Sequence, residues 1–317
     1  MQLLLCGDFD AAEQAAWAQA LRAALPGHTL WLHRDEAPDA AAIEVAIVAN
    51  PPPGSLAGLP GLRLIQSLWA GVDRLLGDPS LPHGVPLARM VDPAMNAAMA
   101  ETALWSVLSL HRGFFDYCRQ QARGVWLQGP QTRANAWPVL VLGHGQMGRA
   151  VAGALARQGY PVQAWRRGEG GALTAAAPGV EVLSGDAALA AARARARVII
   201  NLLPLTADTR GLIDAAWLAA MAPGACLVNL ARGAHLVEAD LLAALASGQI
   251  GHAVLDVFDT EPLPAGHAFW QHPQVTLLPH AAALTDARSA AAVVAHNIEA
   301  LTTGRPVLHQ VARDAGY

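Results

Sequence analysis

Three side chains of different chemistry each follow a short apolar run in the second half of the chain: Arg232, Glu261 and His280. Short apolar runs bounded by turn residues are typical of buried strands. Parallel strands place their carboxyl ends at one edge of a sheet, where ligands bind. We therefore expect a guanidinium, a carboxylate and an imidazole in one cleft. An arginine can hold a carboxylate through paired N–H donors, and a histidine oriented by a carboxylate can give a proton to a developing alkoxide.

None of these three residues is informative alone. The chain contains 12 histidines, so a single histidine after a strand is more often a structural or surface residue. Arg232 alone is equally typical of a solvated loop, and Glu261 before Pro262 can serve only to shape a turn. The prediction of a catalytic site depends on their joint order and on their positions after three separate strands.

A glycine-rich segment, Gly143-His144-Gly145-Gln146-Met147-Gly148, has the spacing of a dinucleotide-binding loop. It follows the apolar run at residues 139–142 and opens a helical pattern at residues 149–158, which is the context that the motif requires. The first glycine permits a tight turn, the second lets backbone N–H groups approach a pyrophosphate, and the third lets helix and strand pack closely. The diphosphate would lie at the positive N-terminus of the helix. The alternative is a glycine-rich turn in an α/β domain without a ligand.

The choice between NADH and NADPH depends on the residue about 20 positions past the loop, at the end of the second strand. Here the apolar run at residues 162–165 is followed by Arg166 and Arg167, and the carboxylate of an NAD-specific site is absent from this position. Two guanidiniums can form charge-assisted bonds with a 2′-phosphate. The sequence therefore favours NADP(H) and leaves NAD(H) as a second cofactor. The alternative is a pair of solvated arginines, one of them neutralised by Glu169.

The elements that must position these residues alternate between short apolar strands and helical segments, which predicts an α/β fold with parallel sheets. We expect strands at residues 1–6, 45–49, 62–67, 139–142, 162–165, 198–202, 226–230, 253–257 and 275–278. We expect helices at residues 11–24, 99–121, 149–158 and 286–301. The strands from Val139 onward would complete the six-stranded sheet of a dinucleotide-binding domain.

Composition and charge exclude several classes of function. The chain has 317 residues, of which 53% are hydrophobic and 15% charged; this suits a two-domain α/β protein and argues against disorder. A net charge of −4 without a basic run predicts no binding to nucleic acid. The apolar stretches are too short for a membrane span, and residues 3–6 lack the basic flank of a signal peptide, so we expect a cytoplasmic protein without a membrane partner. The three scattered cysteines predict neither a disulfide framework nor a metal site.

Taken together, these segments resemble the D-isomer-specific 2-hydroxyacid dehydrogenases. The resemblance covers most of residues 99–286, and its motifs are highly specific in combination. They lie at residues 143–148, 201–206, 229–233, 255–264 and 280. Within the family, residues 201–206, 229–238 with the unusual His235, and 256–264 are most similar to the glyoxylate/hydroxypyruvate reductases.

The resemblance implies two doubly wound parallel-sheet domains. A Rossmann-type NAD(P)-binding domain would span residues 99–285, and a discontinuous, flavodoxin-like substrate-binding domain would combine residues 1–98 and 286–317. Arg232, Glu261 and His280 would be the catalytic residues. The substrate would contact Arg232 and His280 and, in the other domain, Trp69, Ala70 and Gly71. Besides the glycine loop (Gly143, His144, Gly145, Gln146, Met147, Gly148) and the two arginines (Arg166, Arg167), the implied cofactor contacts are Leu203, Pro204, Thr209, Ala231 and Asp256.

The implied activity is the reduction of small 2-ketoacids, glyoxylate and hydroxypyruvate, to 2-hydroxyacids by hydride transfer from NADPH. Two departures bear on the substrate: Ala49-Asn50 stands where the subgroup has an aromatic residue, and three alanines follow His280. The alternatives are a dehydrogenase of the same family with another substrate, such as phosphoglycerate, formate or a larger ketoacid, and a dinucleotide-sensing, corepressor-like binding protein. The chain shows no DNA-binding module, and all three catalytic positions are filled.

Aromatic residues gather in one segment of a chain with only 5% aromatics: Trp105, Phe114, Phe115, Tyr117 and Trp126. This pattern is typical of a core helix and of an interface alike. The family resemblance favours the second interpretation, a homodimer built on the cofactor domains.

Overall fold

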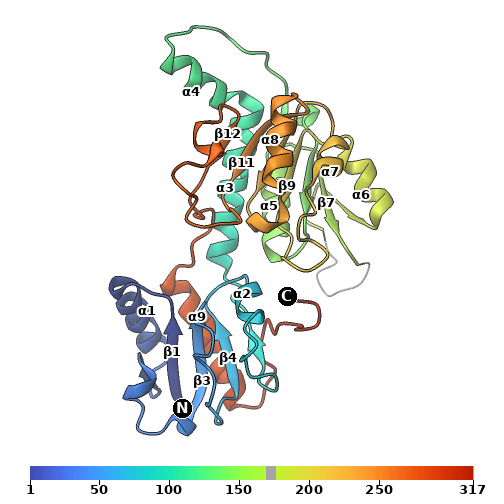
Figure 1. Ribbon diagram of the computed structural model, residues 1–317. Coiled ribbons are helices and arrows are strands. Elements are labelled where there is room, and N and C mark those ends of the chain that lie inside the picture. The colour runs from blue at the N-terminus through green and yellow to red at the C-terminus, as the bar shows by residue number, and fades with distance from the viewer. Residues whose placement is uncertain (169–175, 317) are drawn as a thin grey trace. The chain divides into compact units, whose positions relative to one another are not determined.

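The computed structural model describes residues 1–168 and 176–316, so Glu169 lies outside the described residues. The chain divides into two compact units. The first comprises Met1–Met95 and Thr285–Tyr317, and the second comprises Asn96–Leu284. Each unit contains its own parallel sheet covered by helices (Figure 1). The prediction of an α/β fold with two parallel sheets is confirmed.

The first unit contains a five-stranded sheet with the order β2-β1-β3-β4-β5, which is the flavodoxin-like order. Its strands are β1 (Gln2–Gly7), β2 (Thr29–Trp31), β3 (Ile43–Ala49), β4 (Leu64–Ser67) and β5 (Leu87–Ala88). Its helices are α1 (Ala11–Ala24), α2 (Asp73–Leu76) and α9 (Ala287–Thr302), with two single turns at η1 (Arg34–Glu36) and η2 (Ala40–Ala42). α1 begins with a capping box between Asp10 and Glu13, and it packs against α9, so the two ends of the chain meet in this unit.

The second unit contains a seven-stranded sheet with the order β12-β11-β10-β9-β6-β7-β8. Its strands are β6 (Val139–Leu142), β7 (Val162–Arg166), β8 (Val180–Ser184), β9 (Val198–Asn201), β10 (Ala225–Asn229), β11 (Ile250–Leu255) and β12 (Val275–Leu277). Its helices are α3 (Pro93–Arg112), α4 (Phe114–Ala122), α5 (Gln146–Arg157), α6 (Asp186–Arg193), α7 (Ala215–Ala219) and α8 (Glu238–Ala246), and its short turns are η3 (Ala134–Ala136), η4 (Gly233–His235) and η5 (Ala268–Gln271). The strand order reverses beside β6, the place where open α/β sheets bind their ligands.

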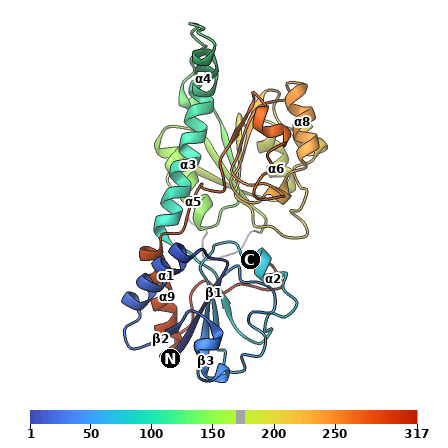
Figure 2. The same ribbon diagram turned by 60° about the vertical axis from the view of Figure 1, so that its left-hand side comes forward.

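The sheet of the second unit is buried on both faces, which explains why its central strands read as continuous apolar runs. Leu140 and Leu142 of β6 point into a core formed with α6, α7 and α8, whereas Val139 and Val141 point into a second core formed with α3 and α5. Figure 2 shows these two helical layers on opposite sides of the sheet. This packing fixes the carboxyl ends of β6, β9, β10 and β11 at one edge.

Three local expectations were wrong or incomplete. The single helix expected at residues 99–121 is two helices, because Gly113 adopts a left-handed conformation (φ 71°) that ends α3 and starts α4. The sheet has a seventh strand, β8, which lies at an edge, is only partly buried and therefore lacks a continuous apolar run. β2 and β5 have three and two residues, too few for a periodic pattern. Within the described residues, no helix is both long and apolar enough to cross a lipid bilayer.

Candidate active site

His280 and Glu261 form the central pair of the candidate site. Nδ1 of His280 lies 2.7 Å from Oε2 of Glu261, and the other oxygen, Oε1, accepts a hydrogen bond of 2.9 Å from the Phe258 amide. Because a carboxylate only accepts, the proton in the pair belongs on Nδ1, which leaves Nε2 as the nitrogen for exchange with another molecule. The His280 side chain is 51% exposed, so its ring remains accessible. The structure thus brings together two of the three residues expected to be catalytic.

Asp256 holds the turn that carries His280. Its buried carboxylate accepts hydrogen bonds from the amides of Ala281 (2.7 Å) and Ala282 (3.1 Å), and its carbonyl accepts one from the His280 amide (2.8 Å). His280 itself has a left-handed φ of 53°, which a non-glycine residue adopts only when its surroundings hold it there. Burial raises the pKa of Asp256, and the two amides and the nearby His280 oppose that shift. This carboxylate therefore has a supporting function within the chain besides the cofactor contact expected of it.

Arg232 follows β10, the neighbour of β11, and its turn lies directly against the turn that holds Glu261. A Cβ on Gly233 would be 1.9 Å from the carbonyl carbon of Phe258, so only glycine permits this approach of the two backbones. Nη1 of Arg232 donates to the Ala231 carbonyl at 2.7 Å. The guanidinium-bearing turn and the His280–Glu261 pair therefore occupy the same edge of the sheet.

The glycine-rich loop has the geometry that a dinucleotide needs. Gly143 has a φ of +100°, and a Cβ on Gly148 would lie 1.8 Å from the Gly143 carbonyl oxygen, so the loop can pack on α5 only with glycine at both positions. Around Gly145 the space is open, because no heavy atom lies within 4 Å of the position of a Cβ. Gly145 is also the N-cap of α5 and makes no side-chain cap, so nothing in the loop blocks an anion at this helix N-terminus. These residues fit a bound NADP(H).

His144 lies inside this loop and is 5% exposed. Among the described residues, neither of its ring nitrogens has a hydrogen-bond partner, which is unusual for a buried imidazole. Burial lowers its pKa, and Arg149 and Arg166 lower it further. Within the described part of the chain, both ring nitrogens of this imidazole therefore stay unsatisfied inside the loop.

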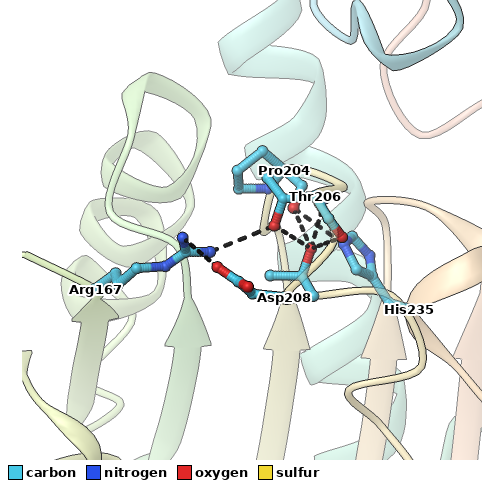
Figure 3. A network of polar contacts seen from close by, with 6 residues as sticks. Arg167, Pro204, Thr206, Asp208 and His235 are labelled. Atoms are coloured by element: carbon cyan, nitrogen blue, oxygen red, sulfur yellow. Dashed lines mark hydrogen bonds and ion pairs between the residues drawn. The ribbon is translucent and has the colours of Figure 1, made fainter. Parts of the chain in front are cut away.

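The arginines expected at the ribose phosphate lie where β7 ends. Arg166 is the last residue of the strand, and Arg167 follows it. Nη1 of Arg167 lies 3.1 Å from the carboxylate of Asp208, and Nη2 lies 3.4 Å from the hydroxyl of Thr206 (Figure 3). Residues 203–209, the loop after β9, therefore face the end of β7.

The remaining expected contacts lie in this loop or in the first unit. Thr209 is buried, donates to the Pro204 carbonyl at 2.8 Å and accepts from the Thr206 amide at 2.8 Å, while the Leu203 amide donates to Asn201. Trp69, Ala70 and Gly71 follow β4 in the first unit, where Trp69 packs edge-on against Trp17 with ring centroids 6.2 Å apart. These three residues belong to the first unit, whereas the glycine loop and the His280–Glu261 pair belong to the second.

The sequence analysis assigned no individual role to several polar residues near the site. Asn201 and Asn229 are the last residues of β9 and β10, and both are fully buried, as is His235. The available signal was an asparagine at the end of an apolar run, since a buried amide requires partners for its donors and its acceptor. Asp208 gave no signal in the sequence, because its partner Arg167 is 41 residues away.

Comparisons with known proteins agree on one family. The model of the NAD-binding domain of D-isomer specific 2-hydroxyacid dehydrogenases matches residues 104–282, more than half of the chain. Three solved structures are similar along the whole chain; each similarity covers 100% of this chain and 99% of the other. A D-isomer specific 2-hydroxyacid dehydrogenase from Xanthobacter autotrophicus Py2, in complex with NADPH and MES, is 38% identical and has a TM-score of 0.92. An NADPH-dependent glyoxylate/hydroxypyruvate reductase from Sinorhizobium meliloti, in complex with NADP and sulfate, is 33% identical and has a TM-score of 0.91. A probable 2-hydroxyacid dehydrogenase from Rhizobium etli, in complex with NADP, HEPES and L(+)-tartaric acid, is 26% identical and has a TM-score of 0.90.

Proposed function

Because the chain belongs to the D-isomer specific 2-hydroxyacid dehydrogenases, which are NAD(P)-dependent oxidoreductases, we propose that it reduces small 2-ketoacids, glyoxylate and hydroxypyruvate, with NADPH. The observation that carries this proposal is the His280–Glu261 pair, with 2.7 Å between Nδ1 and Oε2, at the sheet edge that also bears the glycine loop. The similarity to the reductase from Sinorhizobium meliloti, at 33% identity, supports the choice of substrates.

The proposed mechanism divides the reaction among three side chains. NADPH, when bound on the glycine loop, supplies the hydride. Arg232 binds the substrate carboxylate or polarises its carbonyl, because the guanidinium offers parallel N–H donors. Nε2 of His280 gives its proton to the carbonyl oxygen as negative charge develops there. Glu261 holds the other ring nitrogen and fixes the direction in which Nε2 points.

Ala70 and Gly71, in the turn after β4, offer two backbone N–H donors. Among the described residues, neither the Ala70 nor the Gly71 amide donates a hydrogen bond to the protein. The Trp69 carbonyl accepts a hydrogen bond from the Met90 amide, and the Trp69 amide donates one to the Ser67 hydroxyl. These two bonds hold the turn in place. We propose that these two amides bind the substrate carboxylate.

The direct test is a turnover assay with purified protein, NADPH and a panel of 2-ketoacids, followed at the nicotinamide absorbance. We expect the highest kcat/KM for glyoxylate and hydroxypyruvate, lower values for pyruvate and the lowest for phenylpyruvate. A clear preference for phenylpyruvate or a branched ketoacid would contradict the proposed substrate class but leave the enzyme class intact. No turnover of any ketoacid, with intact NADPH binding, would instead favour the binding-protein alternative.

We also propose that the protein is a homodimer in the cytoplasm. Large apolar side chains are exposed along α3, α4 and the segment that follows: Trp105 (41%), Phe114 (50%), Trp126 (96%) and Leu127 (65%). A groove of about 460 Å³ between α3 and α4 is lined by several of their neighbours, among them Leu104, Leu108 and Phe115. Exposed apolar patches of this kind mark interaction surfaces in soluble proteins.

The proposed localisation in the cytoplasm is supported by the three free cysteines, which suit a reducing compartment.

The dimer can be checked by light scattering at micromolar concentration. We expect a mass of about twice the 33.1 kDa of one chain. The double variant Trp126→Ser/Leu127→Ser removes two exposed apolar side chains, and it is expected to weaken the dimer without changing the unfolding temperature of the monomer. If the wild-type protein has the mass of a single chain at this concentration, the proposed dimer is ruled out.

A further inference from the structure

His235 stands in the middle of a buried polar network that no role in the proposed mechanism explains. It ends η4, three residues after Arg232, and it is fully buried. Its Nδ1 lies 3.0 Å from Nδ2 of Asn201. Its Nε2 lies 3.2 Å from the carbonyl oxygen of Pro204 (Figure 3). One ring thus contacts the end of β9 with one nitrogen and the loop after β9 with the other.

The hydrogen bonds around Asn201 determine which ring nitrogen carries a proton. Oδ1 of Asn201 accepts the Leu203 amide at 3.2 Å, which fixes the orientation of the side-chain amide. Its Nδ2 therefore donates to His235 Nδ1 and also to Oδ1 of Asn229, at 3.0 Å. Because Nδ1 accepts, the ring proton is on Nε2, and Nε2 donates to the Pro204 carbonyl. Nδ1 therefore accepts a hydrogen bond from Asn201, and Nε2 donates one to Pro204.

On one side, the network reaches the backbone of the proposed catalytic arginine. Oδ1 of Asn229 also accepts the Ala231 amide at 3.3 Å, and its Nδ2 donates to the Arg232 carbonyl at 3.0 Å. Asn229 is fully buried, so an unmade bond here is not replaced by one to water. The position of the Arg232 turn therefore depends on Asn229, and the orientation of Asn229 depends on Asn201 and His235.

On the other side, the network reaches the loop that faces the end of β7. The Pro204 carbonyl accepts from both His235 and the Thr209 hydroxyl, and the latter also accepts the Thr206 amide. The Thr206 hydroxyl in turn lies 3.4 Å from Arg167. A continuous series of hydrogen bonds thus connects the residue after β7 to the carbonyl of Arg232, and His235 joins its two halves.

We propose that His235 is a positioning residue for this reaction. Its Nε2 holds the loop at residues 203–209 in the position that binds the cofactor, and its Nδ1 holds the Arg232 turn in the position that binds the substrate. The inference rests on the proposed roles of Arg232 and of the loop. Backbone bonds from Gly211 to Ala234 and from Ile213 to His235, both 2.8 Å, join these segments independently of the ring. The segments consequently stay together when the side chain changes, and only their fine placement is lost.

Two substitutions separate the two functions of the ring. Asparagine places its side-chain oxygen close to the position of Nδ1 and has no donor at the position of Nε2; glutamine places its amide nitrogen close to Nε2 and leaves Asn201 without its acceptor. For His235→Asn we expect the Kd for NADPH, measured by direct fluorescence binding, to rise about 3- to 10-fold with kcat within about two-fold. For His235→Gln we expect kcat with glyoxylate to fall about 3- to 10-fold and the Kd to stay within about two-fold.

His111 provides a matched control. It is also a buried histidine whose two nitrogens bridge two segments, at 2.9 Å to the Tyr160 hydroxyl and 3.0 Å to the Thr132 carbonyl. Its partners precede β7 and β6, so they lie at the amino edge of the sheet, opposite the candidate site. His111→Asn and His111→Gln are expected to lower the unfolding temperature as the His235 variants do, and to change neither the Kd nor kcat.

The outcomes distinguish this inference from the proposed function. If His235→Asn and His235→Gln change the Kd and kcat in parallel, or change neither, His235 is a packing residue and the inference is wrong. If the wild-type protein itself turns over no ketoacid, the proposed function fails, whereas the effect of His235→Asn on NADPH binding remains measurable.

Should a His235 variant fail to fold, Asn229→Asp tests the same hydrogen-bond network from the end that contacts Arg232. Its carboxylate loses the donor to the Arg232 carbonyl, and kcat is expected to fall with an unchanged Kd; an unchanged kcat would overturn the inference.

Discussion

His280→Ala is expected to lower kcat for glyoxylate about 10²- to 10⁴-fold, with the Kd for NADPH unchanged. A positioned general acid contributes a factor of this size, because the proton must reach the carbonyl oxygen as the hydride arrives at the carbon. The ring is half exposed and contacts Glu261 rather than the glycine loop, so its loss removes no contact that holds the dinucleotide. Single-turnover kinetics at saturating NADPH would measure the chemical step directly.

The pair formed by His267 and Glu238 is a suitable control for this experiment. It is also a histidine–glutamate pair in the second unit, with 3.1 Å between Nε2 and Oε2, and it holds the start of α8. His267→Ala is expected to lower stability and to leave kcat unchanged. If His280→Ala keeps the wild-type rate, or if His267→Ala loses as much activity, His280 is not the proton donor.

Features set by local sequence were predictable, and the glycine loop is the clearest example. The φ of +100° at Gly143 and the contact of Gly148 with the Gly143 carbonyl are requirements of a strand–turn–helix unit that lies entirely within a few residues. The approach of Glu261 to His280 followed from one topological rule, since parallel strands end at the same edge. Helix α1 has the bounds expected from the sequence, and the capping box of Asp10 and Glu13 that starts it is also local.

Features set by tertiary contacts were not predictable from one sequence. The break at Gly113 depends on a backbone conformation that glycine permits and does not require. The contact between Arg167 and Asp208 and the bridging position of His235 depend on how the loop after β9 folds back, which no spacing in the sequence encodes. For Asp256, the family resemblance implied a contact with the cofactor, and its bonds to the turn after His280 emerged only from the structure.

Arg166→Asp is expected to weaken NADPH binding by about 2–4 kcal/mol, which corresponds to about a 30- to 1000-fold rise in Kd. Arg166 ends β7, the strand after the glycine loop, where NAD-specific sites place a carboxylate for the ribose hydroxyls. The substitution removes a cation from the expected site of the 2′-phosphate and adds an anion that repels it. NADH lacks this phosphate, so its Kd should change little or fall, and the ratio of the two Kd values should invert.

Two further variants show whether the effect comes from this site. Arg166→Gln removes the charge without adding repulsion, and it is expected to weaken NADPH by roughly half as much in free energy, with a smaller dependence on salt concentration. Arg195→Asp makes the same charge change at an exposed residue in the turn before β9, at the amino edge of the sheet, and it should leave both Kd values unchanged. Arg166 would have no part in cofactor choice if the wild-type protein used NADH with the same kcat/KM as NADPH, or if Arg195→Asp reproduced the loss, because the effect would then reflect net charge alone.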